Sequence, residues 1–263
     1  MGKLSNHRIV DLIEKNNRGI LSIYFTAGYP NLEDTMAIAF HLQKSGADLI
    51  EIGIPYSDPV ADGPTIQESN QRALENGMNL DLLMGQLKST RADIGIPIIL
   101  MGYFNPILQY GVERFCVDCQ QRGIDGLVIP DLPVQEYLTH YQHIFKQHDL
   151  HSIFLITPQT SEARIRWIDE NSESFIYAVS DSSITGAKRD INDRQIAYFE
   201  RLQSMKLKHP FIIGFGISDQ KTFNLACKFA KGAIIGSAFI NVLREATDLE
   251  PAIHQFVQSV KNH

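Results

Sequence analysis

Short apolar runs alternate with longer amphipathic segments along almost the whole chain. The runs are centred near Leu21, Ile50, Ile98, Leu127, Ile153, Ile176, Ile212 and Ile234. Because they are apolar at nearly every position, they are typical of strands that are buried on both faces, as in a parallel sheet. The pattern therefore predicts eight parallel strands.

The segments between these runs have the spacing of amphipathic helices. They cover residues 32–44, 66–75, 80–91, 109–122, 134–148, 162–171, 191–205 and 220–229. Helical crossovers between eight buried strands favour a closed (β/α)8 barrel, the TIM barrel, over an open doubly wound sheet, which is the structural alternative. An amphipathic segment at residues 4–17 predicts an extra helix before the first strand, and two further helical patterns close the chain.

Composition supports one large domain. The 263 residues are 44% hydrophobic and 21% charged, and no linker or low-complexity tract divides residues 1–263. The net charge of −6 argues against a nucleic-acid surface, and no stretch reaches the roughly 20 apolar residues of a membrane span. We expect a soluble, cytoplasmic protein without nucleic-acid or membrane partners.

Cysteine and histidine positions favour neither disulfides nor a metal. Three cysteines indicate a reducing compartment, and Cys116 and Cys119 lie within a helical pattern that lacks the context of a redox motif. The histidines cluster in sequence at a helix end and the start of a strand: His140, His143, His148 and His151. We expect them to be solvated and expect no metal site.

The second apolar run carries a carboxylate at its carboxyl end. Glu51 has the opposite parity to Ile50 and Ile52, so it points inward in a closed barrel. A buried carboxylate costs free energy unless it is partnered or protonated, which makes it a functional candidate. The alternative is a strand-end Glu paired to an Arg.

The loop after Glu51 is stiff and acidic. Pro55, Pro59 and Pro64 restrict its backbone and so give Asp62 a defined direction. The run EIGIPYSDPVADGPT, residues 51–65, closely resembles the signature of the tryptophan synthase alpha subunit, although Tyr56 stands where many members have Phe. The resemblance implies a barrel that cleaves indole-3-glycerol phosphate to indole and glyceraldehyde 3-phosphate, with Glu51 and Asp62 as its catalytic carboxylates.

Glycine turns follow the last two predicted strands. Gly214 and Gly216 follow the seventh, and Gly236 and Ser237 follow the eighth, where barrels typically bind phosphate through backbone N–H groups. The alternative is two tight strand-to-helix turns. The resemblance implies that Gly216, Gly236 and Ser237 contact phosphate.

The loop after the sixth strand, residues 180–193, is long and polar, as in an ordinary flexible connection or a closing lid. The resemblance implies a lid in which Thr185 approaches Asp62 and Gly186 joins the phosphate site. Asp181 and Ser183 depart from the Arg and Gly of well-known members.

Apolar and aromatic residues near the strand ends predict a pocket for an indole ring. Tyr24, Leu100 and Tyr177 could each be plain core, but together they match the family pattern of an indole slot.

Cleavage of a carbon–carbon bond needs a base and an electron sink. No Lys falls at the carboxyl end of a predicted strand, so an imine is not expected. Protonation of indole carbon three would instead make the ring the sink. The hypothesis is that Glu51 protonates that carbon and takes the hydroxyl proton. This role requires a raised pKa of Glu51, which a dry site would give. Asp62 would stabilise the positive charge at the ring nitrogen.

The resemblance also implies a partner, a pyridoxal-phosphate beta subunit in an alpha2beta2 heterotetramer. Residues 103–106 and 130–133 are the loops expected at the interface, and this chain is expected to bind no cofactor itself. The alternative interpretations are a non-catalytic regulatory subunit and another phosphate-binding barrel, such as a sugar-phosphate isomerase.

Overall fold

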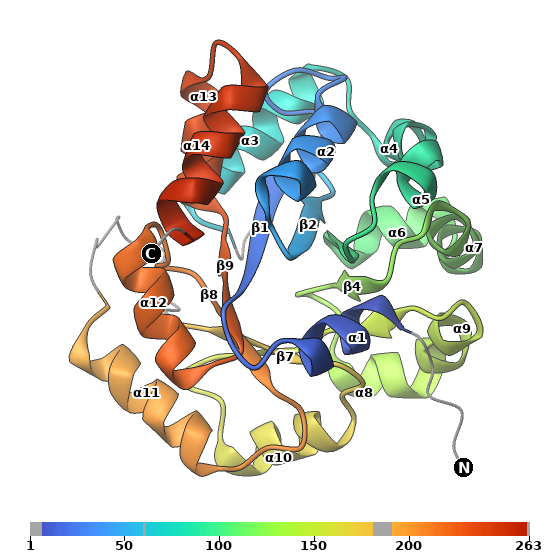
Figure 1. Ribbon diagram of the computed structural model, residues 1–263. Coiled ribbons are helices and arrows are strands. Elements are labelled where there is room, and N and C mark those ends of the chain that lie inside the picture. Colours follow the sequence, from blue (N-terminus) through green and yellow to red (C-terminus); the bar gives the residue numbers. More distant parts are fainter. Residues whose placement is uncertain (1–6, 60–61, 181–190, 262–263) are drawn as a thin grey trace.

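The chain folds into a curled parallel sheet surrounded by helices (Figure 1). The computed structural model describes residues 7–59, 62–180 and 191–261. The strands are β1 (Ile20–Thr26), β2 (Leu49–Gly53), β3 (Ile98–Met101), β4 (Gly126–Val128), β5 (His151–Ser152), β6 (Leu155–Ile156), β7 (Ile176–Val179), β8 (Phe211–Gly214) and β9 (Gly232–Ile235). Their order in the sheet is β5-β4-β3-β2-β1-β9-β8-β7-β6, and neighbouring strands in this order run parallel.

The described part has nine hydrogen-bonded strands where the sequence predicts eight, because the fifth predicted strand is split. Its first piece, β5, pairs with β4, and its second piece, β6, pairs with β7. Between them, Ile153 N donates to Leu127 O at 2.9 Å, and Phe154 O accepts from Tyr177 N at 2.9 Å. The two outer strands of the sheet order are therefore consecutive pieces of one extended segment.

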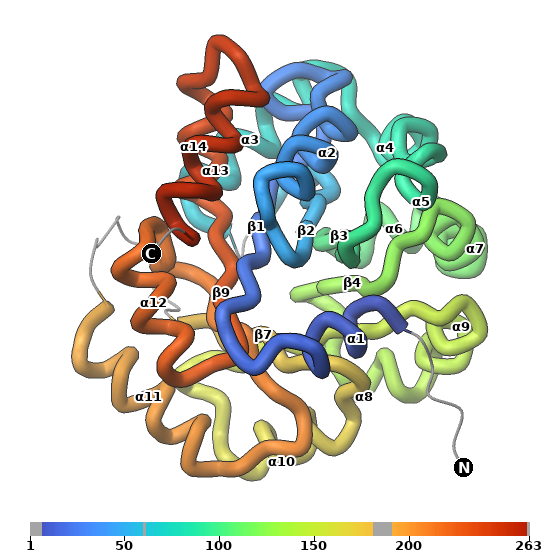
Figure 2. Tube along the Cα trace, in the orientation of Figure 1, coloured from blue at the N-terminus to red at the C-terminus, as the bar shows by residue number. Residues whose placement is uncertain are grey.

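Helices follow most strands and pack around the outside of the sheet (Figure 2). Their bounds are α1 (Arg8–Lys15), α2 (Thr35–Ser45), α3 (Pro64–Glu75), α4 (Leu80–Gln86), α5 (Thr90–Asp93), α6 (Phe104–Tyr110), α7 (Val112–Arg122), α8 (Val134–Glu136), α9 (Gln142–Gln147), α10 (Glu162–Glu170), α11 (Asp193–Ser204), α12 (Gln220–Phe229), α13 (Ser237–Glu245) and α14 (Leu249–Lys261). A 3-10 turn (Leu87–Ser89) precedes α5, and a π-helical turn (Tyr137–Tyr141) links α8 to α9. Within the described residues, none of these helices has both the length and the apolar character needed to cross a membrane.

One predicted helix is divided in two. The segment 109–122 belongs to α6 and α7, which meet at Gly111, whose φ of 93° lies in the left-handed region. Glycine adopts that conformation without steric cost, so the chain turns there instead of continuing one helix.

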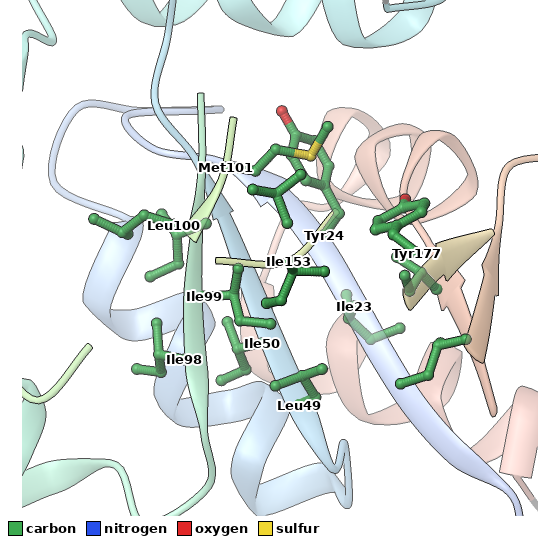
Figure 3. Close-up of a cluster of buried hydrophobic side chains, with 14 of the residues drawn as sticks. Ile23, Tyr24, Leu49, Ile50, Ile98, Ile99, Leu100, Met101, Ile153 and Tyr177 are labelled. Carbon is green, nitrogen blue, oxygen red and sulfur yellow. The ribbon is translucent and has the colours of Figure 1, made fainter. Parts of the chain in front are cut away.

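Strand register fixes which side chains face the interior. Tyr24 pairs with Glu51, and Glu51 pairs with Ile99, so these three side chains share one face. All residues of β1 and β2 are buried, because one face packs inside the curled sheet and the other against the helices. Figure 3 shows part of this interior, with Tyr24, Tyr177, Ile99 and Ile153 drawn together.

The helix α1 lies against the amino-terminal ends of the strands. A Cβ at Gly126 of β4 would lie 3.1 Å from Ile9 Cδ1, and Arg8 Nε donates to Asp125 Oδ1 at 2.7 Å. His7 stacks on His151, with ring centroids 3.5 Å apart and an interplanar angle of 5°. The expectation that His151 is a solvated histidine is therefore wrong, because register places it on the same face as Gly126.

Candidate active site

Glu51 lies near the carboxyl end of β2 and is completely buried. Its Oε1 accepts a hydrogen bond of 3.0 Å from Ser22 Oγ. Its Oε2 is buried and has no hydrogen-bond partner among the residues that the structure describes. A buried carboxyl oxygen that lacks a protein partner is available to a ligand.

Burial raises the pKa of Glu51 to about 8, and the hydrogen bond from Ser22 opposes that rise. At neutral pH the carboxyl group is therefore mostly protonated, since desolvation disfavours the charged form. The expected raised pKa of Glu51 is confirmed, with burial as the physical cause. A neutral carboxyl group with a pKa in this range can donate a proton near pH 7.

Asp62 lies two residues before α3 and is also buried, with 6% of its surface exposed. Tyr103 Oη donates to Asp62 Oδ2 at 3.4 Å. Burial raises the pKa of Asp62 to about 6, and the hydrogen bond from Tyr103 lowers it. At neutral pH Asp62 is therefore mostly a carboxylate, so the two acids differ in protonation state.

The segment between the acids is anchored on both sides. Ile54 N donates to Met101 O at 2.7 Å, and Tyr56 N donates to Asn70 Oδ1 on α3 at 3.2 Å. The ring of Tyr56 stacks on Tyr103 with centroids 5.0 Å apart. These contacts attach the start of the loop to β3 and α3.

Tyr24 and Tyr177 lie in the buried interior of the curled sheet (Figure 3). Burial raises the pKa of each phenol, and the charges of both Glu51 and Asp62 raise it further, so both acids lie near both rings. A Cβ at Gly53 would lie 2.2 Å from Tyr24 Oη, and one at Gly214 would lie 2.4 Å from the Tyr177 ring. Glycine at these two positions makes room for the aromatic rings.

Leu100 does not face this interior. It pairs with Ile52, one residue beyond Glu51, so its side chain points to the opposite face of the sheet. In Figure 3 it lies on the other side of its strand from Ile99. The prediction that Leu100 lines the pocket is wrong, and Met101, which pairs with Gly53, takes the inward position at this strand end.

The glycine turns lie at the carboxyl ends of β8 and β9. Gly216 has φ of 73°, and Ser180 Oγ lies 3.5 Å from the position of a Cβ built on it. Gly236 directly precedes α13, which begins at Ser237, and a Cβ at Gly236 would lie 3.3 Å from the Tyr24 ring. The first N–H groups of a helix have no intrahelical partner, so the start of α13 can donate to an anion close to Tyr24.

Four residues of the predicted lid lie outside the described residues. They are Thr185 and Gly186, expected near Asp62 and the phosphate, and Asp181 and Ser183, where the sequence departs from the family pattern. Their predicted roles stay predictions.

The sequence analysis does not identify two residues that contact the acids. Ser22 contacts Glu51, and Tyr103 contacts Asp62. A sequence signal exists for each, since Ser22 is a polar residue inside an apolar strand and Tyr103 follows β3 directly at its carboxyl end.

Other titratable clusters have no comparable arrangement. Cys116 and Cys119 are fully buried on α7, and burial raises the pKa of Cys116 to about 12, which leaves the thiol unreactive. A hollow of about 430 Å³ between α4 and α7 is lined by Asp81, Arg114 and Asp118, whose charges are paired with one another. No group of three metal-ligating side chains gathers anywhere in the ranges that the structure describes.

Fold and site together define an α/β enzyme of the parallel-barrel type, with a neutral buried acid and an ionised one at its carboxyl mouth. The family model of the tryptophan synthase alpha chain matches residues 10–263. The chain belongs to this family, whose members are lyases that cleave indole-3-glycerol phosphate in tryptophan biosynthesis.

Similar proteins cover nearly the whole chain. The tryptophan synthase alpha chain of Flavobacterium psychrophilum is 59% identical over 231 residues, 88% of this chain and 91% of the relative. That of Flavobacterium johnsoniae is 54% identical over 97% of this chain and 100% of the relative. The crystal structure of tryptophan synthase subunit alpha from Legionella pneumophila has a TM-score of 0.86 and 34% identity, covering 97% of each chain.

Proposed function

We propose that this chain cleaves indole-3-glycerol phosphate to indole and glyceraldehyde 3-phosphate with Glu51 as proton donor and acceptor and Asp62 as a carboxylate. The observation that carries the assignment is the difference between two buried acids near the same tyrosines. The pKa of Glu51 is about 8 and that of Asp62 about 6, so near pH 7 one is neutral and the other charged. Proton transfer to the substrate needs a protonated acid, and stabilisation of a positive charge needs a carboxylate.

The first step is protonation of the indole ring. Glu51 transfers its proton to ring carbon three, and the ring becomes an indoleninium cation with its positive charge at the nitrogen. Asp62, as a carboxylate, stabilises that charge through the ring N–H. Because both groups are largely shielded from water, their interaction with the developing charge is stronger than in solution.

The second step breaks the carbon–carbon bond. Glu51, now a carboxylate, accepts the proton of the side-chain hydroxyl next to carbon three. The carbon–oxygen bond becomes the aldehyde of glyceraldehyde 3-phosphate, and the electrons of the broken bond restore the indole ring. Glu51 ends the cycle protonated, so neither a metal nor an imine is required.

The substrate is proposed to lie with its ring beside Tyr24 and Tyr177 and its phosphate at the glycine turns. The closeness of Gly236 to the Tyr24 ring supports this placement, since it relates an anion site at the start of α13 to the aromatic wall. Gly216, Gly236 and Ser237 would donate backbone or hydroxyl hydrogen bonds to phosphate. Thr185 and Gly186 are proposed to complete the site from the lid.

Three finer assignments belong to the same proposal. We infer that β5 and β6 act as one barrel strand, which makes the fold a (β/α)8 barrel in one domain with α1 as an extra helix over its amino-terminal end. The partner would be a tryptophan synthase beta subunit in an alpha2beta2 complex, to which pyridoxal phosphate would be bound. Residues 104–106 of the expected interface segment 103–106 form the start of α6 and not a loop, and Leu108 on the same helix is 52% exposed, which supports that contact.

An assay of indole release tests the function. Purified chain is incubated with indole-3-glycerol phosphate, with and without a beta subunit, and indole and glyceraldehyde 3-phosphate are quantified. We expect equal amounts of both products and faster release with the partner. A chain that binds substrate but releases no indole in either condition would instead be the regulatory subunit.

A further inference from the structure

Ser22 is a hydroxyl residue inside an otherwise apolar stretch of β1, and it contacts the acid that the proposed function depends on. Its Oγ donates to Glu51 Oε1 at 3.0 Å, and both side chains are completely buried. A buried hydroxyl in a strand needs a hydrogen-bond partner, and here that partner is a functional carboxyl group.

Register shows from which side Ser22 reaches the acid. Tyr24 pairs with Glu51, and Ser22, two residues earlier on the same face, pairs with Leu49. Ser22 therefore lies closer to the amino-terminal end of the barrel than Glu51 does. It therefore contacts the carboxyl group from the amino-terminal side of the sheet.

The contact makes the two oxygens of Glu51 different. Oε1 accepts from Ser22, whereas Oε2 has no partner among the described residues. In a neutral carboxyl group only one oxygen carries the proton, and an oxygen that accepts a hydrogen bond from a hydroxyl is suited to be the carbonyl oxygen. The proton of Glu51 then lies on Oε2.

We propose that Ser22 is a positioning residue that holds Oε1 of Glu51, so that Oε2 carries the transferable proton and faces the substrate carbon. This inference rests on the proposed function, in which Glu51 is the proton donor. In this assignment Oε2 donates the proton to carbon three in the first step and accepts the hydroxyl proton in the second.

Ser22 also acts on the ionised state of Glu51. After the first transfer the carboxylate is buried, and the Ser22 hydroxyl is its one hydrogen-bond donor among the described residues. Burial raises the pKa of Glu51, and this hydrogen bond lowers it. Loss of the hydroxyl should therefore raise the pKa of Glu51 further and make it a weaker acid.

The test compares Ser22→Ala, which removes the hydroxyl, with Ser22→Thr, which keeps it. Measurements are kcat and KM for indole release between pH 6 and 10. We expect Ser22→Ala to lower kcat about tenfold at pH 7 with KM nearly unchanged, and to move the upper pH limit of kcat upward by about one unit. Ser22→Thr should restore most of the rate and the original pH limit.

A matched control is Ser172→Ala. Ser172 is a buried serine whose hydroxyl donates to Ile168 O at 2.8 Å, between α10 and β7 at the amino-terminal side of the sheet. Its loss removes a comparable hydrogen bond without touching an acid, so kcat and its pH dependence should stay as in the wild type.

A second readout separates this inference from the proposed function. The carboxyl carbon of Glu51 is titrated by ¹³C NMR in the wild type and in Ser22→Ala, without substrate, and the variant should titrate at higher pH. An unchanged titration, or equal losses of kcat in Ser22→Ala and Ser22→Thr, overturns the role of Ser22. Absence of indole release by the wild type contradicts the proposed function instead.

Discussion

Buried acids at the two ends of the barrel have different partners. At the amino-terminal end, Asp125 accepts from Arg8 Nε at 2.7 Å and from Ile98 N at 2.8 Å. Asp169 accepts from two backbone N–H groups, those of Lys208 and His209, at 2.7 and 2.9 Å. Each of these carboxylates is therefore satisfied by N–H donors.

At the carboxyl end, the partners of buried acids are few and uncharged. Among the residues that the structure describes, Glu51 has a single hydroxyl donor on one oxygen, and Asp62 has a phenol at 3.4 Å. Burial raises the pKa of both. Burial also raises the pKa of Asp125, but there the Arg8 guanidinium opposes the rise. The two ends thus differ in the partners of their buried acids: N–H donors pair the charge at the amino-terminal end, whereas Glu51 at the other end stays neutral and suited to proton transfer.

The largest effect on activity should come from Glu51→Gln. The amide keeps the shape but has no transferable proton, so kcat for indole release should fall by about 10³- to 10⁴-fold. The free energy of unfolding, measured in urea at pH 7, should not decrease, because the amide buries no charge. A variant with near-normal turnover would show that Glu51 is a structural acid like Asp125.

Asp125→Ala should lower stability and leave activity unchanged, the opposite of what we expect for Glu51→Gln. Removing the carboxylate leaves the Arg8 charge without its ion-pair partner at a partly buried site, and we expect the free energy of unfolding to fall by about 3 kcal/mol. The activity per folded molecule should stay near that of the wild type, because Asp125 lies at the far end of the barrel. Urea unfolding and the indole assay on the same sample would separate the two quantities.

Asp62→Asn should lower kcat by about 10²- to 10³-fold. The amide cannot offset positive charge at the ring nitrogen, although it can still accept a hydrogen bond from Tyr103. The chain should unfold at the same urea concentration as the wild type or higher. If the rate loss were within twofold, charge stabilisation by Asp62 would be refuted.

Stability should respond to pH through Glu51. With a folded-state pKa of about 8 and an ordinary unfolded value of 4.5, the folded state binds more protons than the unfolded state between these pH values. The wild type should therefore lose stability relative to Glu51→Gln as the pH rises from 5 to 9, by about 4 kcal/mol in total. Urea unfolding of both proteins at several pH values measures the difference, and parallel curves would mean that burial does not raise the pKa of Glu51.

Much of this molecule follows from periodicity. The alternation of apolar runs and amphipathic segments predicts the order of strands and helices, and the parity of Glu51 within its strand predicts an inward carboxyl group. The fifth strand is one exception, besides the helix divided at Gly111, because its ladder is interrupted at Ile153 and Phe154, which the apolar pattern there does not reveal.

Contacts between strands could not be predicted in the same way. The alternation of side chains within a strand tells which of its residues share a face. Only the register between strands tells which residues of the neighbouring strand lie on that same face. The family pattern places Leu100 in the pocket, whereas register puts Ile99 and Met101 on that face, and the contact of Ser22 with Glu51 likewise depends on register. The raised pKa values likewise depend on burial by residues distant in sequence.

The most direct test of the central claim is the pH at which Glu51 releases its proton in the folded chain. The protein is labelled with ¹³C at glutamate carboxyl carbons, and the Glu51 signal is assigned by its absence in Glu51→Gln. We expect this carbon to titrate near pH 8, as a buried acid that is neutral at pH 7. Titration near pH 4.5 would show an ordinary ionised carboxylate and contradict the account.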